Sequence, residues 1–287
     1  MDKNSFLEAL EEYVNTAPGN HVDGKIALRP ELAGMRIFDK PLFGFAGAGD
    51  PLFGELKKPG VIGGHFLAPG EWLAGARTVV SAFLPFTRTV REANRLSRDW
   101  PADEWLHGRI EGQAFAGEFC LYAKSLLEAE GRLCVVPLLD PRFSTKSPVS
   151  EDKNDEARFT SNWSERHAAY ICGLGTFGLS RGLITSLGVA GRLASLITDW
   201  ELAPSERAYT GIYDYCSRCG ACAKNCPAGA ISLEQGKRHV PCSAFLDRVM
   251  ERHRPRYGCG KCQTAVPCEA GIPKRRSGAG GDSIAGG

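Results

Sequence analysis

Hydrophobic and polar positions along this chain of 287 residues form two kinds of pattern. Apolar residues at helical spacing predict a short amphipathic helix over residues 6–14 and a longer helix over 111–130, which ends at Gly131. Two blocks rich in apolar and β-branched residues, 76–85 and 133–139, predict buried strands. A strand, a helix and a strand in this order predict an α/β core of two or three layers.

Other stretches before residue 203 show weaker patterns. Residues 44–64 are rich in Gly, Pro and Phe without a period, which predicts a packed irregular segment. Residues 144–156 are polar and charged, as expected of an exposed loop, and 162–172 have helical spacing. Two apolar runs, 183–186 and 192–202, are separated by a glycine-containing turn and predict a hairpin.

The cysteines add chemistry to this picture, because four of the eleven follow the spacing C-x2-C-x2-C-x3-C-P. They are Cys216, Cys219, Cys222 and Cys226, with Pro227 directly after. This is the run of bacterial ferredoxins, in which the first three cysteines bind one 4Fe–4S cluster and the fourth binds the other. Two intervening residues form a tight loop that turns successive sulfurs toward one cluster. We therefore predict a ferredoxin-like segment.

A second set of cysteines follows, with one further C-x2-C step. From ferredoxin pseudosymmetry we assign one cluster to Cys216, Cys219, Cys222 and Cys268, and the other to Cys226, Cys242, Cys259 and Cys262. Two zinc sites of four cysteines each are the alternative, since C-x2-C pairs bind either metal. Three cysteines at successive two-residue gaps with a C-P ending favour iron and sulfur.

Composition bounds the class of protein. Hydrophobic residues make up 43% and charged residues 24%, which is normal for a globular protein with a core. We see no run of about 18 apolar residues and expect no membrane span. The first residues lack the basic and apolar blocks of a secretory signal, and the cysteines have metal-ligand spacing, so we expect a cytoplasmic protein.

The net charge of +2 does not itself indicate a partner, but basic residues gather between the cysteine sets. Such a cluster suits tRNA or an acidic electron donor, and the alternative is a solvated helix face. Its members are Lys237, Arg238, Arg248, Arg252, Arg254 and Arg256.

Gly173, Gly175 and Gly178 spell G-x-G-x-x-G, and Asp199 follows about twenty residues later, as in a dinucleotide-binding fingerprint. A dinucleotide-binding loop follows a buried strand and opens a helix. Here the preceding residues have helical spacing and the following ones look extended. The context therefore argues against NAD binding.

The stretch from 161 to 273 resembles the epoxyqueuosine reductase family and its reductive dehalogenase relatives. In those proteins a segment of the type A-G-L-G-x-x-G, and then T-D, precedes C-x2-C-x2-C-x3-C-P. The matching residues here are Gly173, Leu174, Gly175, Gly178, Thr198 and Asp199, followed by the cysteines.

The resemblance implies an α+β fold in two parts. Residues 1–210 would form a nitroreductase-like cobalamin-binding domain, and 211–276 a ferredoxin-like domain with two 4Fe–4S clusters. Residues 277–287 are of low complexity and are expected to be a disordered tail. The clusters would pass electrons from a low-potential donor, such as ferredoxin or flavodoxin, to the corrinoid. The resemblance places the corrinoid (cobalamin) against Gly173, Leu174, Gly175, Thr176, Phe177, Gly178 and Ser180.

The chain departs from the family where a proton donor is expected. Ser161 to Ser164 stand where epoxyqueuosine reductases have an acidic residue, and Leu179 replaces a basic or amide residue. Asp140, at the end of an expected strand, and His167, before the glycines, are the candidate catalytic residues. Their alternatives are a turn aspartate before proline and a core or surface histidine.

Two minor groups remain. His107 and Arg109 form a compact polar group suited to an anion, or else to ordinary loop solvation. Cys120, Cys134 and Cys172 lie in apolar contexts and are expected to be buried thiols.

Three hypotheses of function follow. The first is a corrinoid-dependent iron–sulfur oxidoreductase with an unknown substrate. The second is an electron-transfer protein that reduces a partner's corrinoid or another acceptor. The third is a tRNA-modifying epoxyqueuosine reductase variant.

Overall fold

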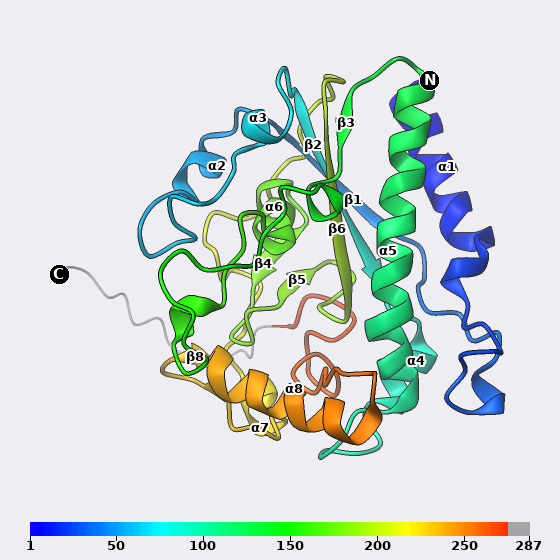
Figure 1. Cartoon of the computed structure of the whole chain (residues 1–287), viewed down its shortest axis with the longest axis vertical. Helices are drawn as coiled ribbons and strands as arrows, with labels where there is room; N and C mark the ends of the chain where they lie inside the picture. Colours follow the sequence, from blue (N-terminus) through cyan, green and yellow to red (C-terminus); the bar gives the residue numbers. More distant parts are fainter. Residues whose placement is uncertain (275–287) are drawn as a thin grey trace.

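The computed structural model describes residues 1–274, and a four-stranded antiparallel sheet lies at its centre (Figure 1). The strand order is β1-β2-β6-β3. The longest pairing joins β2 to β6, from Thr78 opposite Thr198 to Pro85 opposite Gly191. The four strands are β1 (Leu42–Gly47), β2 (Thr78–Pro85), β3 (Cys134–Val135) and β6 (Gly191–Thr198).

Helices cover both faces of this sheet, so the α+β core has three layers (Figure 1). On one face α1 (Lys3–Thr16) and α5 (Asp103–Ala129) pack together. The side chain of Val80 on β2 joins this cluster, whereas its neighbour Val79 faces the other way, because side chains alternate along a strand. The second face is covered by α2 (Pro51–Glu55), α3 (Pro69–Trp72) and α6 (Glu165–Ile171).

The remaining elements are short, apart from α8, and most belong to the cysteine-rich part of the chain. A small hairpin of two strands follows α6, and a second one lies between the first four cysteines and α8. The elements are α4 (Arg88–Ala93), β4 (Gly175–Phe177), β5 (Leu183–Thr185), α7 (Ala221–Lys224), β7 (Ile231–Ser232), β8 (Gly236–Lys237) and α8 (His239–His253).

Several sequence predictions are confirmed. The helix expected at 6–14 is α1, the one at 111–130 is part of the longer α5, and the strand at 76–85 is β2, whose residues are all buried. The loop over 144–156 contains no helix or strand before residue 156. The helix expected over 162–172 is α6.

Two strand predictions need correction. The segment 44–64 is not wholly irregular, because β1 includes its first residues and pairs with β2. Gly44 is essential for this, since a Cβ there would lie 2.3 Å from the carbonyl oxygen of Cys172. The strand expected over 133–139 is only the two-residue β3, after which Pro137 begins a 3-10 turn.

The hairpin predicted from the runs at 183–186 and 192–202 is wrong. β5 pairs with β4, whereas β6 leaves that hairpin and lies between β2 and β3 in the main sheet. The turn at Gly188 does reverse the chain, but Gly191 then passes close to β2, where a Cβ would lie 2.3 Å from the carbonyl oxygen of Leu84. β5 is buried and β6 is largely buried, so the composition of the two runs did not reveal their partners.

The cysteine-rich part packs directly on α4 and α5. Glu269, which is 3% exposed, pairs with Arg91 at 3.1 Å and also with Arg95. At the other edge Arg256 pairs with Glu111 at 2.5 Å. The predicted domain boundary at 210 stays a prediction, and the predicted tail at 277–287 lies outside the described residues. Within residues 1–274, no helix combines the length and the apolar character needed to cross a membrane.

Candidate iron–sulfur centre

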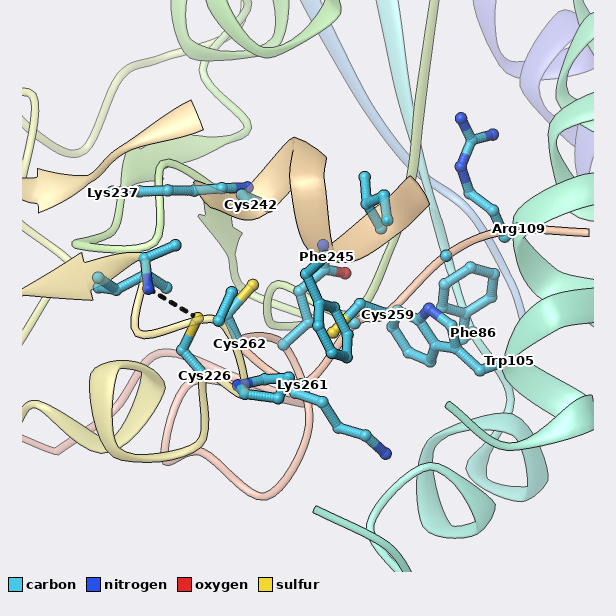
Figure 2. Close-up of a pocket in the computed structure, with 18 of the residues that line it drawn as sticks. Phe86, Trp105, Arg109, Cys226, Lys237, Cys242, Phe245, Cys259, Lys261 and Cys262 are labelled. Carbon is cyan, nitrogen blue, oxygen red and sulfur yellow. Dashed lines mark hydrogen bonds between the residues drawn. The ribbon is translucent and has the colours of Figure 1, made fainter. Parts of the chain in front are cut away.

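The structure brings the eight cysteines of the predicted ligand sets together around two separate cavities. The larger cavity, of about 250 Å³, is drawn in Figure 2. Its cysteines are Cys226, Cys242, Cys259 and Cys262. A smaller cavity lies against the hairpin of β4 and β5, and its cysteines are Cys216, Cys219, Cys222 and Cys268. The division matches the crossed assignment made from the sequence.

Electrostatic neighbours support the same grouping. Burial, together with the nearby Cys222, Cys216 and Cys219, raises the pKa of Cys268 to about 12. Burial likewise raises the pKa of Cys259 to about 12, with added contributions from Cys262 and Cys242. These apolar surroundings disfavour free thiolates, so a positive group that binds the sulfurs would stabilise them.

The loops that carry the cysteines are shaped by backbone hydrogen bonds. Gly220 adopts φ +74°, a conformation that glycine takes without strain, and α7 begins at the next residue. The amide of Ala230 donates to the sulfur of Cys226 at 3.3 Å, as Figure 2 shows by its dashed line. Cys242 lies in the first turn of α8. Short helices and a backbone hydrogen bond therefore position Cys222, Cys226 and Cys242.

Within residues 1–274, no three His, Cys, Asp or Glu side chains lie close enough together to hold a single metal ion. The zinc alternative needs four thiolates around one ion. In a four-iron cluster each thiolate binds a different iron, so the sulfurs stand further apart and surround a volume. Four cysteines around each cavity are compatible with a cluster of this kind.

The predicted corrinoid residues lie partly elsewhere than expected. A Cβ on Gly175 would lie 1.9 Å from the carbonyl oxygen of Ile184, so this glycine closes the hairpin of β4 and β5. Gly173 adopts φ +83° and approaches the carbonyl oxygen of Glu206 in the same way. Gly178, Leu179 and Ser180 line the smaller cysteine cavity. At Gly173 and Gly175, then, the missing side chains make room for the protein's own backbone.

The other predicted contacts of the corrinoid have partners inside the protein. Thr176 is buried, and its hydroxyl accepts a hydrogen bond from the amide of Tyr215 at 2.8 Å. Leu174 is buried against Phe83 and Leu183. Phe177 packs on the ring of His167, with 4.9 Å between the ring centroids. These residues pack within the protein next to the segment that carries the first cysteines.

Neither candidate proton donor is in its acidic form at neutral pH, since Asp140 is a carboxylate and His167 a neutral imidazole. Asp140 forms an ion pair with Arg142 at 2.8 Å, and the hydrogen bonds from Arg142 lower its pKa to about 2. Burial, aided by Arg166, lowers the pKa of His167 to about 4, and Ser164 bonds to its Nδ1 at 2.8 Å. Neither side chain lines either of the two cavities. Their catalytic roles stay predictions without support from their surroundings.

Sequence reasoning overlooked Glu165, which follows the region where an acidic residue was sought. Burial raises its pKa to about 7, although hydrogen bonds with Ser195 and Trp163 lower it. Its Oε2 atom is buried and has no hydrogen-bond partner among the described residues. The only sequence signal was an acidic residue in the first turn of a predicted helix. Acidic residues are common there because they interact favourably with the helix dipole, so the position alone did not indicate function.

The basic residues noted between the cysteine sets differ in their surroundings. Arg256 is 8% exposed and pairs with Glu111, while Arg248 and Arg252 lie over the ring of Trp100. Lys237 lines the larger cavity, with Arg166 and Arg192, two residues that the sequence did not single out. The three buried thiols were predicted correctly: Cys120, Cys134 and Cys172.

Comparison with known proteins agrees with this site. The family described as 4Fe-4S binding domain matches residues 209–232. The chain resembles the epoxyqueuosine reductases and the reductive dehalogenases. It is 44% identical to the tetrachloroethene reductive dehalogenase of Desulfitobacterium hafniense over 107 residues, which are 35% of this chain and 19% of that protein. A trichloroethene reductive dehalogenase of Dehalococcoides mccartyi is 32% identical over 111 residues, which cover 33% of this chain and 20% of the relative.

The likeness among solved structures extends over nearly the whole chain. An epoxyqueuosine reductase solved with an epoxyqueuosine-modified tRNA stem loop covers 95% of this chain, and the match spans 68% of that protein. The TM-score is 0.52 and the sequence identity 18%, which shows a shared fold. The chain spans about a fifth of the length of the curated reductive dehalogenases named above.

Proposed function

We propose that this chain is an iron–sulfur oxidoreductase in which two 4Fe–4S clusters pass electrons to an acceptor at the α+β domain. One observation carries the proposal: eight cysteines divide between two cavities in the crossed order of a two-cluster ferredoxin. Cys226, from the first run, lies with the later cysteines, and Cys268, the last one, lies with the first three. This exchange is specific to paired clusters.

The protein's own groups have definite parts in this proposal. The two sets of thiolates would each hold one cluster, and a bound 4Fe–4S cluster supplies one-electron transfer. The amide of Ala230 on the sulfur of Cys226 is the kind of hydrogen bond that raises a cluster's potential. Burial raises the pKa of Cys262, and the nearby Lys237 opposes this shift and so favours the ligating thiolate. A low-potential donor such as ferredoxin or flavodoxin would supply the electrons.

The resemblance implies a corrinoid as the acceptor, and the residues predicted to hold it do not fit as expected. Gly173 and Gly175 face the backbone of Glu206 and Ile184 instead of an open wall. We derive no step through a corrinoid for this reason. Equilibrium dialysis of cobalamin against the anaerobic protein measures this directly. Binding at low micromolar concentration supports a corrinoid reductase, and no binding at high micromolar concentration removes it.

The same glycine geometry favours a second candidate, an electron-transfer protein that reduces an acceptor on a partner. A third, a tRNA-modifying reductase, draws on the relative solved with a tRNA stem loop. It predicts binding of tRNA that weakens with salt through Lys237 and its basic neighbours. The pairing of the buried Arg256 with Glu111 removes one member of that basic group from the candidate's support.

The experiment for the main proposal uses two matched variants. Cys268→Ser should lose about four irons from the smaller cavity, and Cys226→Ser about four from the larger one. Electron paramagnetic resonance of the reduced protein should show a different remaining cluster in each variant. Identical spectra from both variants would contradict the crossed assignment. Full iron content in both would refute cluster binding by these residues.

A further inference from the structure

The larger cavity has two ends of different chemistry. Figure 2 shows the cysteines at one side and Arg109, Trp105 and Phe86 at the other. Arg192 belongs to the second end, because it donates to the backbone carbonyl of Arg109 at 3.2 Å and lies over the ring of Phe86 at 6.0 Å. The four-cysteine site explains only the first end.

The cavity carries a large excess of positive charge. Five of its lining residues are cationic, and none of its described lining residues is Asp or Glu. A four-iron cluster with four thiolates carries roughly two negative charges, which leaves about three positive charges that the cluster itself does not balance. A concave surface with charges of one sign concentrates ions of the opposite sign. The five are Arg109, Arg166, Arg192, Lys237 and Lys261.

Arg192 is only partly satisfied, through its hydrogen bond to the carbonyl oxygen of Arg109. Its Nε atom is buried and has no hydrogen-bond partner among the described residues. Burial and the nearby Arg109 lower its pKa to about 9, which leaves it charged at neutral pH. Arg109 donates to the hydroxyl of Tyr257 and lies over its ring at 4.4 Å, and within residues 1–274 neither arginine is paired with a carboxylate. A buried guanidinium without an anion is costly, so a bound anion would relieve it.

We infer that the Arg109–Arg192 end of this cavity binds the carboxylate or phosphate group of a small ligand whose apolar part packs on Phe86 and Trp105. The planar guanidinium suits an oxyanion, which it binds through two parallel hydrogen bonds. The two aromatic rings pack edge to face, with 4.9 Å between their centroids, and form an apolar wall beside the charges. The inference rests on the proposed function, because the count of unbalanced charge assumes a cluster in the larger cavity. It names the class of ligand that the other end of this cavity would bind.

The test is titration calorimetry of the cluster-loaded protein with benzoate, phenyl phosphate and neutral benzamide. We expect at least one of the two anions to bind. The affinity for benzamide should be at least about tenfold lower, because the neutral amide cannot form the charge-assisted pair. The stronger anion identifies carboxylate or phosphate as the ligand group. Failure of both anions to bind at about 10 mM, or equal binding of benzamide, would overturn the inference.

Variants assign the binding to the arginine. Arg192→Met should lower the affinity for the anion about tenfold, and Arg192→Lys should retain part of the original affinity. Arg88→Met, on the exposed part of α4, is the matched control and should bind like the original protein. Unchanged binding by Arg192→Met would contradict the site. Iron content on the same samples separates the two questions, since full iron without anion binding refutes this inference and leaves the proposed function intact.

Discussion

The buried ammonium group of Lys261 donates hydrogen bonds to the backbone oxygen of Asn94 at 2.6 Å and to its side-chain oxygen at 3.0 Å. Lys261 stands between Cys259 and Cys262, and Asn94 is the residue that ends α4. The amide of Asn94 also donates to the backbone oxygen of Cys259 at 3.1 Å. One side chain therefore fixes the loop of the larger cysteine cavity to the α+β core.

Asn94→Ala should destabilise the protein by about 2–4 kcal/mol, because it leaves a buried ammonium and a buried carbonyl with fewer partners. The larger cavity should also lose iron more readily under a chelator. Urea denaturation and iron release measure the two effects. Asn154→Ala in the exposed loop is the control. Equal stability of the two variants would show that this contact does not secure the module.

Glu269 offers a parallel test at the smaller cavity, since it follows Cys268 directly. Its carboxylate pairs with Arg91 and accepts from the amide of Ala265 at 2.7 Å. Glu269→Gln should lower the free energy of unfolding by about 2 kcal/mol. The substitution removes the negative charge that Arg91 and Arg95 face. Glu92→Gln, in an exposed pair with Arg88, should leave the denaturation midpoint unchanged. A loss of equal size in both would refute a special role for Glu269.

Glu165 should make the protein less stable as pH rises through the weakly acidic range. Its pKa of about 7 in the folded state lies above the ordinary 4.5, so the folded state holds the proton more tightly. Stability from this group is complete below pH 4.5 and is lost as pH approaches 7. Glu165→Gln should gain up to about 3 kcal/mol over the original protein at pH 8 and little at pH 4. A constant difference between the two denaturation curves at all pH values would contradict this.

Gly175→Ala should disrupt the hairpin of β4 and β5, because its Cβ would lie 1.9 Å from the backbone oxygen of Ile184. We expect a lower melting temperature and poorer retention of iron in the smaller cavity, which this hairpin borders. Gly49→Ala has no atom within 4 Å of the added Cβ and is the control. If the two variants melt alike, the close packing at Gly175 has no structural role.

The cysteine site could be predicted from sequence because spacing itself encodes the loop. The run from Cys216 to Pro227 fixes three thiols in one turn, and pseudosymmetry places Cys226 with the later cysteines. The crossed grouping required no knowledge of the rest of the fold. The helix α5 and the strand β2 could also be predicted, because α5 has apolar residues at helical spacing and β2 is a continuous apolar run rich in β-branched residues.

The rest depended on tertiary contacts. The partner of β6 could not be predicted because an apolar run that is largely buried looks the same in a hairpin and in a central sheet. The glycines were read as a wall for a cofactor, whereas Gly175 makes room for Ile184. Nothing in the sequence around Arg192 marks it as a functional residue. Only the fold places it beside Arg109 at the larger cavity.

The iron and zinc content of the anaerobically purified protein tests the central claim most directly. Two clusters in the two cysteine cavities predict about eight irons per chain, an equal amount of acid-labile sulfide and a brown colour. Two zinc ions per chain, with no absorption of visible light, would contradict the account.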